Sequence, residues 1–223
     1  MAEKKDIKEV ILDFGSGNTC QNNKDIIKKM IDELCRIDTR KHKVIIKWQL
    51  FKKAGDNIPL TRESFKYAFD YAKQCGYMTT ASIFDFESFV FLKQFKGLPF
   101  IKIANNQELY WLQGYIQDMK NTTYISVGSE RDFINFKNNF ESGKMYNFDL
   151  FCCVSNYPAD AVEYQERFTK KHLSYAISDH TTSFKMYKLY NPKKIEWHYK
   201  LNDSIGLDAG MFSKTPEMLK GVL

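Results

Sequence analysis

The stretch "SYAISDH" (residues 174–180) decides the fold because it joins a buried strand to a polar end. Its apolar residues are typical of a strand in a protein interior, yet it finishes on Ser178, Asp179 and His180. Burying polar groups costs free energy unless they are hydrogen-bonded or paired, so a buried strand is not expected to end in three polar residues without a structural or functional reason. The stretch predicts a strand that carries polar side chains to a site.

Similar short runs occur eight times along the chain, at residues 10–15, 44–49, 77–82, 100–105, 122–128, 148–155, 174–180 and 193–199. Segments with helical spacing lie between them, at residues 22–35, 61–75, 130–140 and 159–172, and a last one follows at 215–223. Asn22 or Asn23, Thr61 and Thr215 are expected helix caps, and Pro216 fits the first helical turn. This alternation predicts parallel strands, because neighbouring parallel strands need a crossover connection.

Eight such units predict a single-domain (β/α)8 barrel that spans residues 1–223. The loops should be short, because the usual barrel has about 250 residues. An open doubly wound sheet remains the alternative, since the same alternation serves both folds. No G-x-G-x-x-G motif follows the first strand, which disfavours the dinucleotide-binding version of that sheet.

The composition indicates a globular, cytoplasmic protein. Hydrophobic residues make up 43% of the 223 residues, which is enough for a sizeable core. The net charge of +6 suits anionic ligands, but the lysines are scattered, so we expect no nucleic-acid partner. The five cysteines include no C-x-x-C pair, which disfavours zinc and redox motifs. We expect no signal peptide and no membrane span, because no run reaches about 18 apolar residues.

Polar residues stand at the C-terminal end of nearly every strand candidate: Asp13, Lys47, Gln49, Ser82, Lys102, Asn105, Ser126, Ser155, Tyr157, Ser178, His180, Glu196 and His198. In a (β/α)8 barrel these ends converge on the rim where such enzymes build their sites. Side chains two apart on a strand face the same way, so each histidine shares a face with the polar residue two positions before it.

His180 and His198 are expected on consecutive strands, about 5 Å apart at the backbone. Two imidazoles that close can share a divalent cation, with water, carboxylate or substrate oxygen completing its shell. A hydrogen-bonded structural pair is the other reading of the same spacing.

Lys47 and Lys102 lie inside apolar runs, where a buried ammonium is costly unless an anion pairs with it. Ser126, Ser178 and Asn105 could add hydrogen bonds to the same anion, and a phosphate would suit this cluster. The alternative is that both lysines reach solvent from the strand ends.

Several motifs resemble those of the sialic acid synthase family, in the family's order from about residue 10 to the end: "KWQLFK", "KIANNQ", "YISVG", "CVSNYP", "ISDHT", "IEWHY" and "GLDAGMFSKTPEMLKGVL". The combination of S-D-H-T with a later E-x-H is the most specific of them. The resemblance implies a (β/α)8 barrel that condenses phosphoenolpyruvate with the open-chain aldehyde of an N-acetylated hexosamine. The products would be a 2-keto sugar acid and phosphate.

The resemblance also implies residue roles. His180 and His198 would hold a divalent metal, most readily Mn²⁺, with Mg²⁺ or Co²⁺ as substitutes. Phosphoenolpyruvate would be surrounded by Lys47, Lys102, Ser126 and Ser178, with Ser82 and Asn105 in slots where the family has Thr and Ser. Gln49 and Tyr157 would contact the sugar. Asp13 falls in the slot of a glutamate, Ser155 in that of an asparagine, and Glu196 keeps the carboxylate before the second histidine. A homodimer is also implied.

Two departures from the family bear on activity. A family acid that handles protons falls on Gln107, and an amide cannot act as a general acid or base. The sequence stops at Leu223, so we expect the family's C-terminal antifreeze-like domain to be absent. Two other functions therefore stay open. One is a barrel that binds metal and anion without turnover, and the other is a Schiff-base aldolase that uses Lys102.

Overall fold

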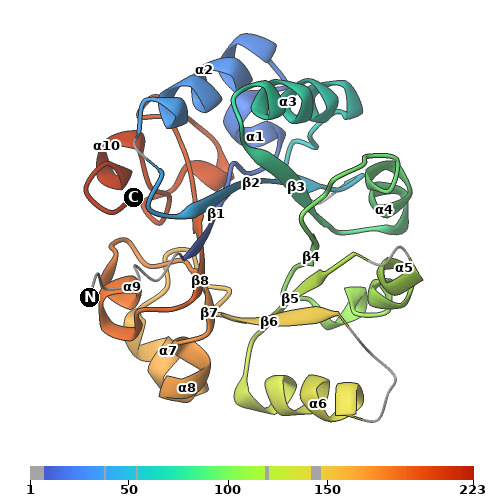
Figure 1. Ribbon diagram of the computed structural model, residues 1–223, viewed down its shortest axis with the longest axis vertical. Coiled ribbons are helices and arrows are strands. Elements are labelled where there is room, and N and C mark those ends of the chain that lie inside the picture. The colour runs from blue at the N-terminus through green and yellow to red at the C-terminus, as the bar shows by residue number, and fades with distance from the viewer. Residues whose placement is uncertain (1–7, 38, 54, 119–120, 142–146) are drawn as a thin grey trace, which may run out of the picture.

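The computed structural model describes residues 8–37, 39–53, 55–118, 121–141 and 147–223. Eight parallel strands in these ranges form a closed barrel in chain order, surrounded by helices (Figure 1). The strands are β1 (Glu9–Asp13), β2 (Lys43–Leu50), β3 (Met78–Ile83), β4 (Ile101–Ile103), β5 (Thr123–Val127), β6 (Phe148–Cys153), β7 (Ala176–Asp179) and β8 (Lys194–His198). β1 pairs with both β2 and β8, which confirms the (β/α)8 barrel and rules out the open sheet.

The helices lie on the outside of the barrel (Figure 1). They are α1 (Gly17–Cys20), α2 (Lys24–Cys35), α3 (Arg62–Gln74), α4 (Phe86–Leu92), α5 (Leu112–Asp118), α6 (Glu130–Glu141), α7 (Ala161–Arg167), α8 (Lys170–Leu173), α9 (Lys185–Tyr190) and α10 (Pro216–Leu219), with 3₁₀ turns η1 (Gln107–Leu109) and η2 (Leu207–Ala209). The expected caps are confirmed. The side chains of Asn23, Thr61 and Thr215 accept hydrogen bonds from the first backbone amides of α2, α3 and α10.

The segment expected to be helical at residues 159–172 is two helices rather than one. Phe168 has an extended backbone at φ −140° and ends α7. Thr169 then begins α8, because its side chain accepts a hydrogen bond from the backbone N–H of His172. The apolar stripe continues across this break, so the sequence pattern alone did not reveal it.

The barrel interior has two layers. The lower layer, here called the apolar layer, consists of Ile11, Ile45, Phe100, Tyr124, Phe151 and Ala176. Two residues further along the same strands come Asp13, Lys47, Lys102, Ser126, Cys153 and Ser178. Because side chains alternate along a strand, these polar side chains also point inward, above the apolar layer. The apolar layer therefore forms the floor of any cavity that opens at the C-terminal end.

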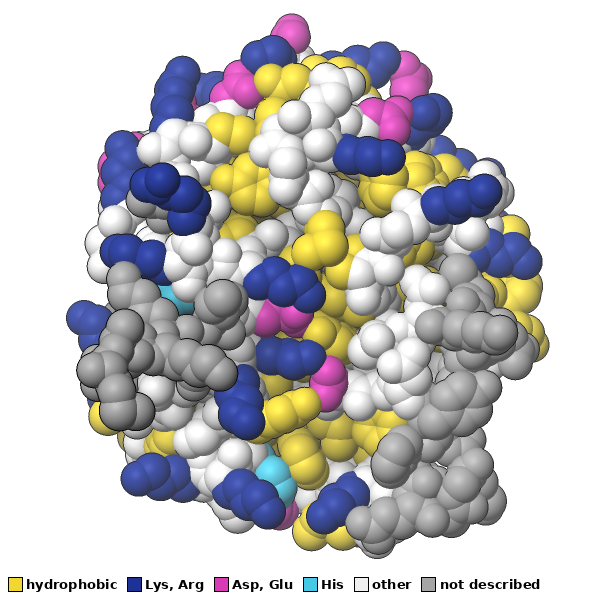
Figure 2. Space-filling model, viewed as in Figure 1, with side chains coloured by type: hydrophobic (Ala, Val, Ile, Leu, Met, Phe, Trp, Pro, Cys, Tyr) yellow, Lys and Arg dark blue, Asp and Glu magenta, His cyan; other side chains and the backbone are white. Residues whose placement is uncertain are grey.

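The charged side chains are distributed over the molecule. On the face shown in Figure 2, Lys and Arg are spread out rather than gathered into one stripe. At the N-terminal end of the barrel, Lys194 donates hydrogen bonds to Tyr124 at 2.7 Å and to Asp149 at 2.6 Å. Within the described residues, no helix has the length and apolar character needed to cross a bilayer.

Candidate active site

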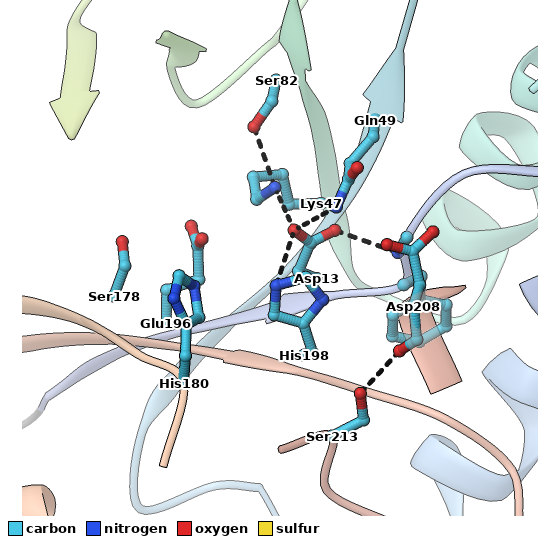
Figure 3. Close-up of polar contacts among 12 residues, drawn as sticks. Asp13, Lys47, Gln49, Ser82, Ser178, His180, Glu196, His198, Asp208 and Ser213 are labelled. Carbon is cyan, nitrogen blue, oxygen red and sulfur yellow. Dashed lines mark hydrogen bonds and ion pairs between the residues drawn. The ribbon is translucent and has the colours of Figure 1, made fainter. Parts of the chain in front are cut away.

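A cavity of about 660 Å³ opens at the C-terminal end of the strands. Thirteen residues proposed from the sequence line it: Asp13, Lys47, Gln49, Ser82, Lys102, Asn105, Ser126, Ser155, Tyr157, Ser178, His180, Glu196 and His198. Figure 3 shows that the labelled side chains among them come from different strands and approach one another. The fold thus brings nearly all of the predicted site residues together, as expected for strand ends in a closed barrel.

Asp13 and Lys47 form a buried ion pair at the base of the cavity. Lys47 Nζ lies 2.6 Å from Asp13 Oδ2 and donates to Ser82 Oγ at 2.8 Å. Gln49 donates to Asp13 Oδ2 at 3.0 Å, and the backbone N–H of Gly15 donates to Asp13 Oδ1 at 2.9 Å. Register explains the contact, because Asp13 and Lys47 are partners across β1 and β2.

The pKa of each partner is shifted toward its charged form. Burial alone would raise the pKa of Asp13, but the charges of Lys47 and His198 and the hydrogen bonds outweigh it and hold that pKa well below its usual range. Burial opposes the charged form of Lys47 as well. The carboxylates of Asp13 and Glu196 overcome it and raise the pKa of Lys47. This Lys47 is therefore an ammonium at neutral pH.

This pair predicts an acid-dependent loss of stability. Because the folded-state pKa of Asp13 is depressed, its contribution is fully present above the ordinary value of 3.8 and is lost as the pH falls toward the folded-state pKa. Urea unfolding measured at successive pH values below about 5 should therefore show a shallower decline for Asp13→Asn than for the wild type. Parallel curves for the two proteins would contradict the prediction.

Lys102 and Glu196 form a second buried pair beside two serines. Lys102 Nζ lies 2.7 Å from Glu196 Oε1 and donates to Ser178 Oγ at 2.8 Å. Ser126 Oγ lies 3.3 Å from Ser178 Oγ. Burial lowers the pKa of Lys102, with the charge of Lys47 adding to the effect and Glu196 opposing it. The other oxygen of Glu196, Oε2, is buried without a hydrogen-bond partner among the described residues.

The two histidines face each other across the upper part of the cavity. Their ring centroids are 5.3 Å apart, with the planes inclined by 64°. His180 Nδ1 donates to the carbonyl oxygen of Val154 at 2.6 Å, so the lone pair lies on Nε2. Burial, and then His198, lowers the pKa of His180 well below its usual value, which keeps the ring neutral. Tyr157 covers His180 at 4.3 Å, and Phe212 packs edge-on against His198 at 4.9 Å.

The donor set suits a divalent ion held by two imidazoles. His180 has its Nδ1–H bonded to a carbonyl, an arrangement typical of metal-binding histidines. His198 Nδ1 is buried with no hydrogen-bond partner in the described part of the chain, and His198 Nε2 lies 3.9 Å from Asp13 Oδ2. No group of three or more His, Cys, Asp or Glu residues in the described ranges could hold a metal. Water or substrate oxygen would therefore have to supply the remaining ligands.

Comparison with models of known protein families shows to which family this chain belongs. The model of the NeuB family matches residues 28–222, which is most of the sequence. The chain belongs to the NeuB family. This confirms the resemblance drawn from the motifs. No curated protein matches the chain.

Solved structures share the fold of this NeuB-family chain at low sequence identity. An N-acetylneuraminic acid synthetase from Leptospira borgpetersenii serovar Hardjo-bovis, solved with citrate, is 20% identical, with a TM-score of 0.74 over 97% of this chain and 81% of the other. A putative spore coat polysaccharide biosynthesis protein E from Chromobacterium violaceum is 17% identical, with a TM-score of 0.72 over 96% and 72%. A truncated 3-deoxy-D-arabino-heptulosonate 7-phosphate synthase from Thermotoga maritima is 10% identical, with a TM-score of 0.66 over 96% and 83%.

Gln107 is the one proposed site residue of the NeuB-family chain that does not line the cavity. It begins η1, where Asn106 caps the turn by accepting from the backbone N–H of Glu108 at 3.0 Å. This turn directs the exposed Gln107 side chain toward α6, where it donates to Asp132 at 3.3 Å. The position therefore lacks an acid and also lies outside the cavity lining.

Sequence reasoning missed several residues that line the cavity, namely Asn57, Phe84, Cys153, Asp208 and Phe212. Asp208 is the most informative of them. Its Oδ2 accepts hydrogen bonds from the backbone and hydroxyl of Ser16, at 3.0 and 2.9 Å, which joins the β8–α10 loop to the connection between β1 and α1. The sequence signal that could have found Asp208 is its place between two glycines, Gly206 and Gly210. Gly206 has a φ of 95° and its backbone packs closely on Asn18, so a tight loop there needs glycine.

Proposed function

We propose that this NeuB-family protein condenses phosphoenolpyruvate with the aldehyde of an N-acetylated hexosamine, releasing phosphate and a 2-keto sugar acid. The observation that carries the proposal is the pair of buried lysines, Lys47 and Lys102, at the closed end of a cavity whose open end holds two facing histidines. Family membership supports the same reaction class.

The lysine end of the cavity is suited to the two anionic groups of phosphoenolpyruvate. Lys47 and Lys102 supply positive charge, and Ser82, Ser126 and Ser178 supply hydroxyl groups. Charge-assisted hydrogen bonds of this kind are stronger than neutral ones and grow stronger in a buried site. The anion would be held with its C3 carbon toward the cavity mouth.

Proton transfer falls to Glu196 in this proposal. When C3 attacks the aldehyde carbon, water adds to C2 and gives up one proton to a base, which can pass it to the new alkoxide. The C2–O bond to phosphate then breaks, and the second proton of the water leaves with the phosphate as the keto group forms. Gln107 cannot take the proton, because it is an amide and lies outside the cavity. Glu196 lines the cavity, and its Oε2 is a buried carboxylate oxygen with no hydrogen-bond partner in the described residues. These features support Glu196 as the general base.

His180 and His198 would hold the divalent ion, with Mn²⁺ preferred and Mg²⁺ or Co²⁺ as substitutes. When bound, such an ion polarises an aldehyde oxygen as a Lewis acid. Gln49, Asn105, Ser155 and Tyr157 stand nearer the rim and would orient the sugar, and Asn105 already donates to Ser155 Oγ at 3.0 Å. Both lysines and both histidines thus have a place in one reaction.

The test is phosphate release from phosphoenolpyruvate in the presence of Mn²⁺ and a panel of N-acetylated hexosamines. We expect release that depends on the sugar and that falls at least about tenfold in His180→Ala and in His198→Ala, because each loses one metal ligand. His172→Ala is the matched control, because His172 lies on α8, contacts Glu130 at 2.7 Å and is not among the residues that line the cavity.

A second candidate function is a metal- and anion-binding subunit without turnover, which the exposed position of Gln107 favours. Mn²⁺ binding with no phosphate release for any sugar in the panel would support this candidate and contradict the first. Covalent trapping of a carbonyl substrate on Lys102 by borohydride would instead support the aldolase. Its buried ion pair with Glu196 argues against that reaction.

A further inference from the structure

Lys214 is a fully buried lysine that the proposed chemistry does not use. It stands in the loop between β8 and α10 and is not among the residues that line the cavity. Its Nζ donates to the carbonyl oxygens of Thr181 at 2.5 Å and Phe212 at 3.0 Å. A buried ammonium costs stability unless its charge is compensated, so the position of Lys214 requires an explanation.

The bonds of Lys214 join the two histidine-bearing strand ends. Thr181 directly follows His180, at the end of β7. Phe212 packs edge-on against the His198 ring with centroids 4.9 Å apart. The backbone N–H of Lys214 also donates to the carbonyl oxygen of His198 at 2.7 Å. One residue therefore holds the backbone beside both imidazoles.

The surroundings of the ammonium group are polar on one side and aromatic on the other. Burial lowers the pKa of Lys214 to about 8, while the nearby charge of Asp179 opposes this shift. Asp179 is itself buried and accepts hydrogen bonds from Thr181 N at 2.9 Å and Trp197 Nε1 at 3.0 Å. The Nζ atom also lies 5.5 Å from the ring centroid of Phe184. Nearby groups thus stabilise the charge of Lys214, and its side chain stays outside the cavity lining.

We propose that Lys214 is a positioning residue, which sets the spacing and orientation of the His180 and His198 rings by joining the Thr181 and Phe212 carbonyls. Without the ammonium group, two buried carbonyl oxygens lose their donor, and the loop that presses Phe212 onto His198 loses its attachment to β7. Any loss of metal affinity on removing Lys214 rests on the proposed function, in which both rings bind the metal. The effect of Lys214 on the orientation of the two rings does not depend on that function.

The first test uses Lys214→Met, which keeps the length of the side chain and removes its charge. The chain has four histidines, so an imidazole ¹H–¹⁵N correlation spectrum resolves each ring, assigned with single His→Ala variants. We expect the signals of His180 and His198 to move and those of His42 and His172 to stay. Unchanged signals for His180 and His198 would overturn the proposal.

The control is Lys194→Met, at the start of β8 and therefore at the opposite end of the barrel. Lys194 also makes two hydrogen bonds, to Tyr124 and Asp149, and both are partly buried. Its loss should lower the thermal midpoint without moving the His180 and His198 signals. If both lysine variants moved those signals equally, the effect would be general loosening of the barrel, and the positioning role would be wrong.

The second test measures Co²⁺ affinity by calorimetry. We expect Lys214→Met to bind Co²⁺ at least about tenfold more weakly than the wild type, as for the loss of a group that orients metal ligands. The double variant Asp179→Asn/Lys214→Met removes the uncompensated carboxylate as well. It should recover stability but not Co²⁺ affinity.

Wild-type Co²⁺ affinity in the destabilised single variant would contradict the positioning role. If the wild type bound no Co²⁺ while the imidazole signals moved in Lys214→Met, the metal part of the proposed function would fail and the positioning role would stand.

Discussion

Replacing Lys47 by methionine is expected to lower the free energy of unfolding by about 3–5 kcal/mol. The substitution leaves the carboxylate of Asp13 in a site where it is only 3% exposed, without the ammonium 2.6 Å away that now balances it. Urea unfolding at neutral pH measures the change. Asp13→Asn/Lys47→Met should recover most of the loss, because removing both charges of a buried pair is close to neutral.

The matched control for this prediction is Lys66→Met. Lys66 also pairs with an aspartate at 2.6 Å, but its side chain is 67% exposed and that of Asp70 is 52% exposed. The loss should stay within about 1 kcal/mol, since water screens an exposed pair. Equal losses in Lys47→Met and Lys66→Met would show that burial does not set the strength of the Asp13–Lys47 pair.

Replacing Glu196 by glutamine is expected to lower kcat for phosphate release by about 10²–10⁴-fold. Glutamine preserves the shape of the side chain and can still accept the hydrogen bond from Lys102, which now lies 2.7 Å from Oε1. It cannot accept the proton of the attacking water. Because the change also leaves Lys102 without a balancing charge, kcat should be measured at a temperature where the thermal midpoint shows the variant to be folded.

Gln107→Glu provides the comparison for Glu196→Gln. The side chain at position 107 is exposed and bonded to Asp132, so a carboxylate there should leave kcat nearly unchanged. A large rise in kcat would show that position 107 can reach the reacting atoms and would shift the proton-transfer role away from Glu196. A near wild-type kcat in Glu196→Gln would also contradict that role.

The sequence was informative about the barrel because its signal is local. Each strand is a short apolar run. Several helices have apolar residues at helical spacing and a cap that can be recognised within a dozen residues, as with Thr61 before α3. The polar residue that ends a strand is equally visible. Side-chain alternation then predicts which pairs share a face, such as Ser178 and His180.

The pairing of the charged groups was not predictable, because it depends on register between strands distant in sequence. Lys102 pairs with Glu196 across the barrel interior, and no local pattern relates β4 to β8. Loops posed the same problem. Asp208 lines the cavity from a loop whose sequence has no periodic pattern. The sequence around Lys214 gives no sign of burial, although the fold buries that lysine completely. Gln107 is turned outward by a single capped turn after β4.

The apolar layer, in which Phe100 and Tyr124 stack with centroids 4.0 Å apart, makes the barrel a tube with one entrance. Molecules that meet inside such a tube must arrive and depart in sequence. In the proposed reaction, the molecule held by the two lysines would have to enter first, since an occupant at the mouth would block its path. Turnover would then require an ordered addition, and a sugar that bound too early would inhibit it.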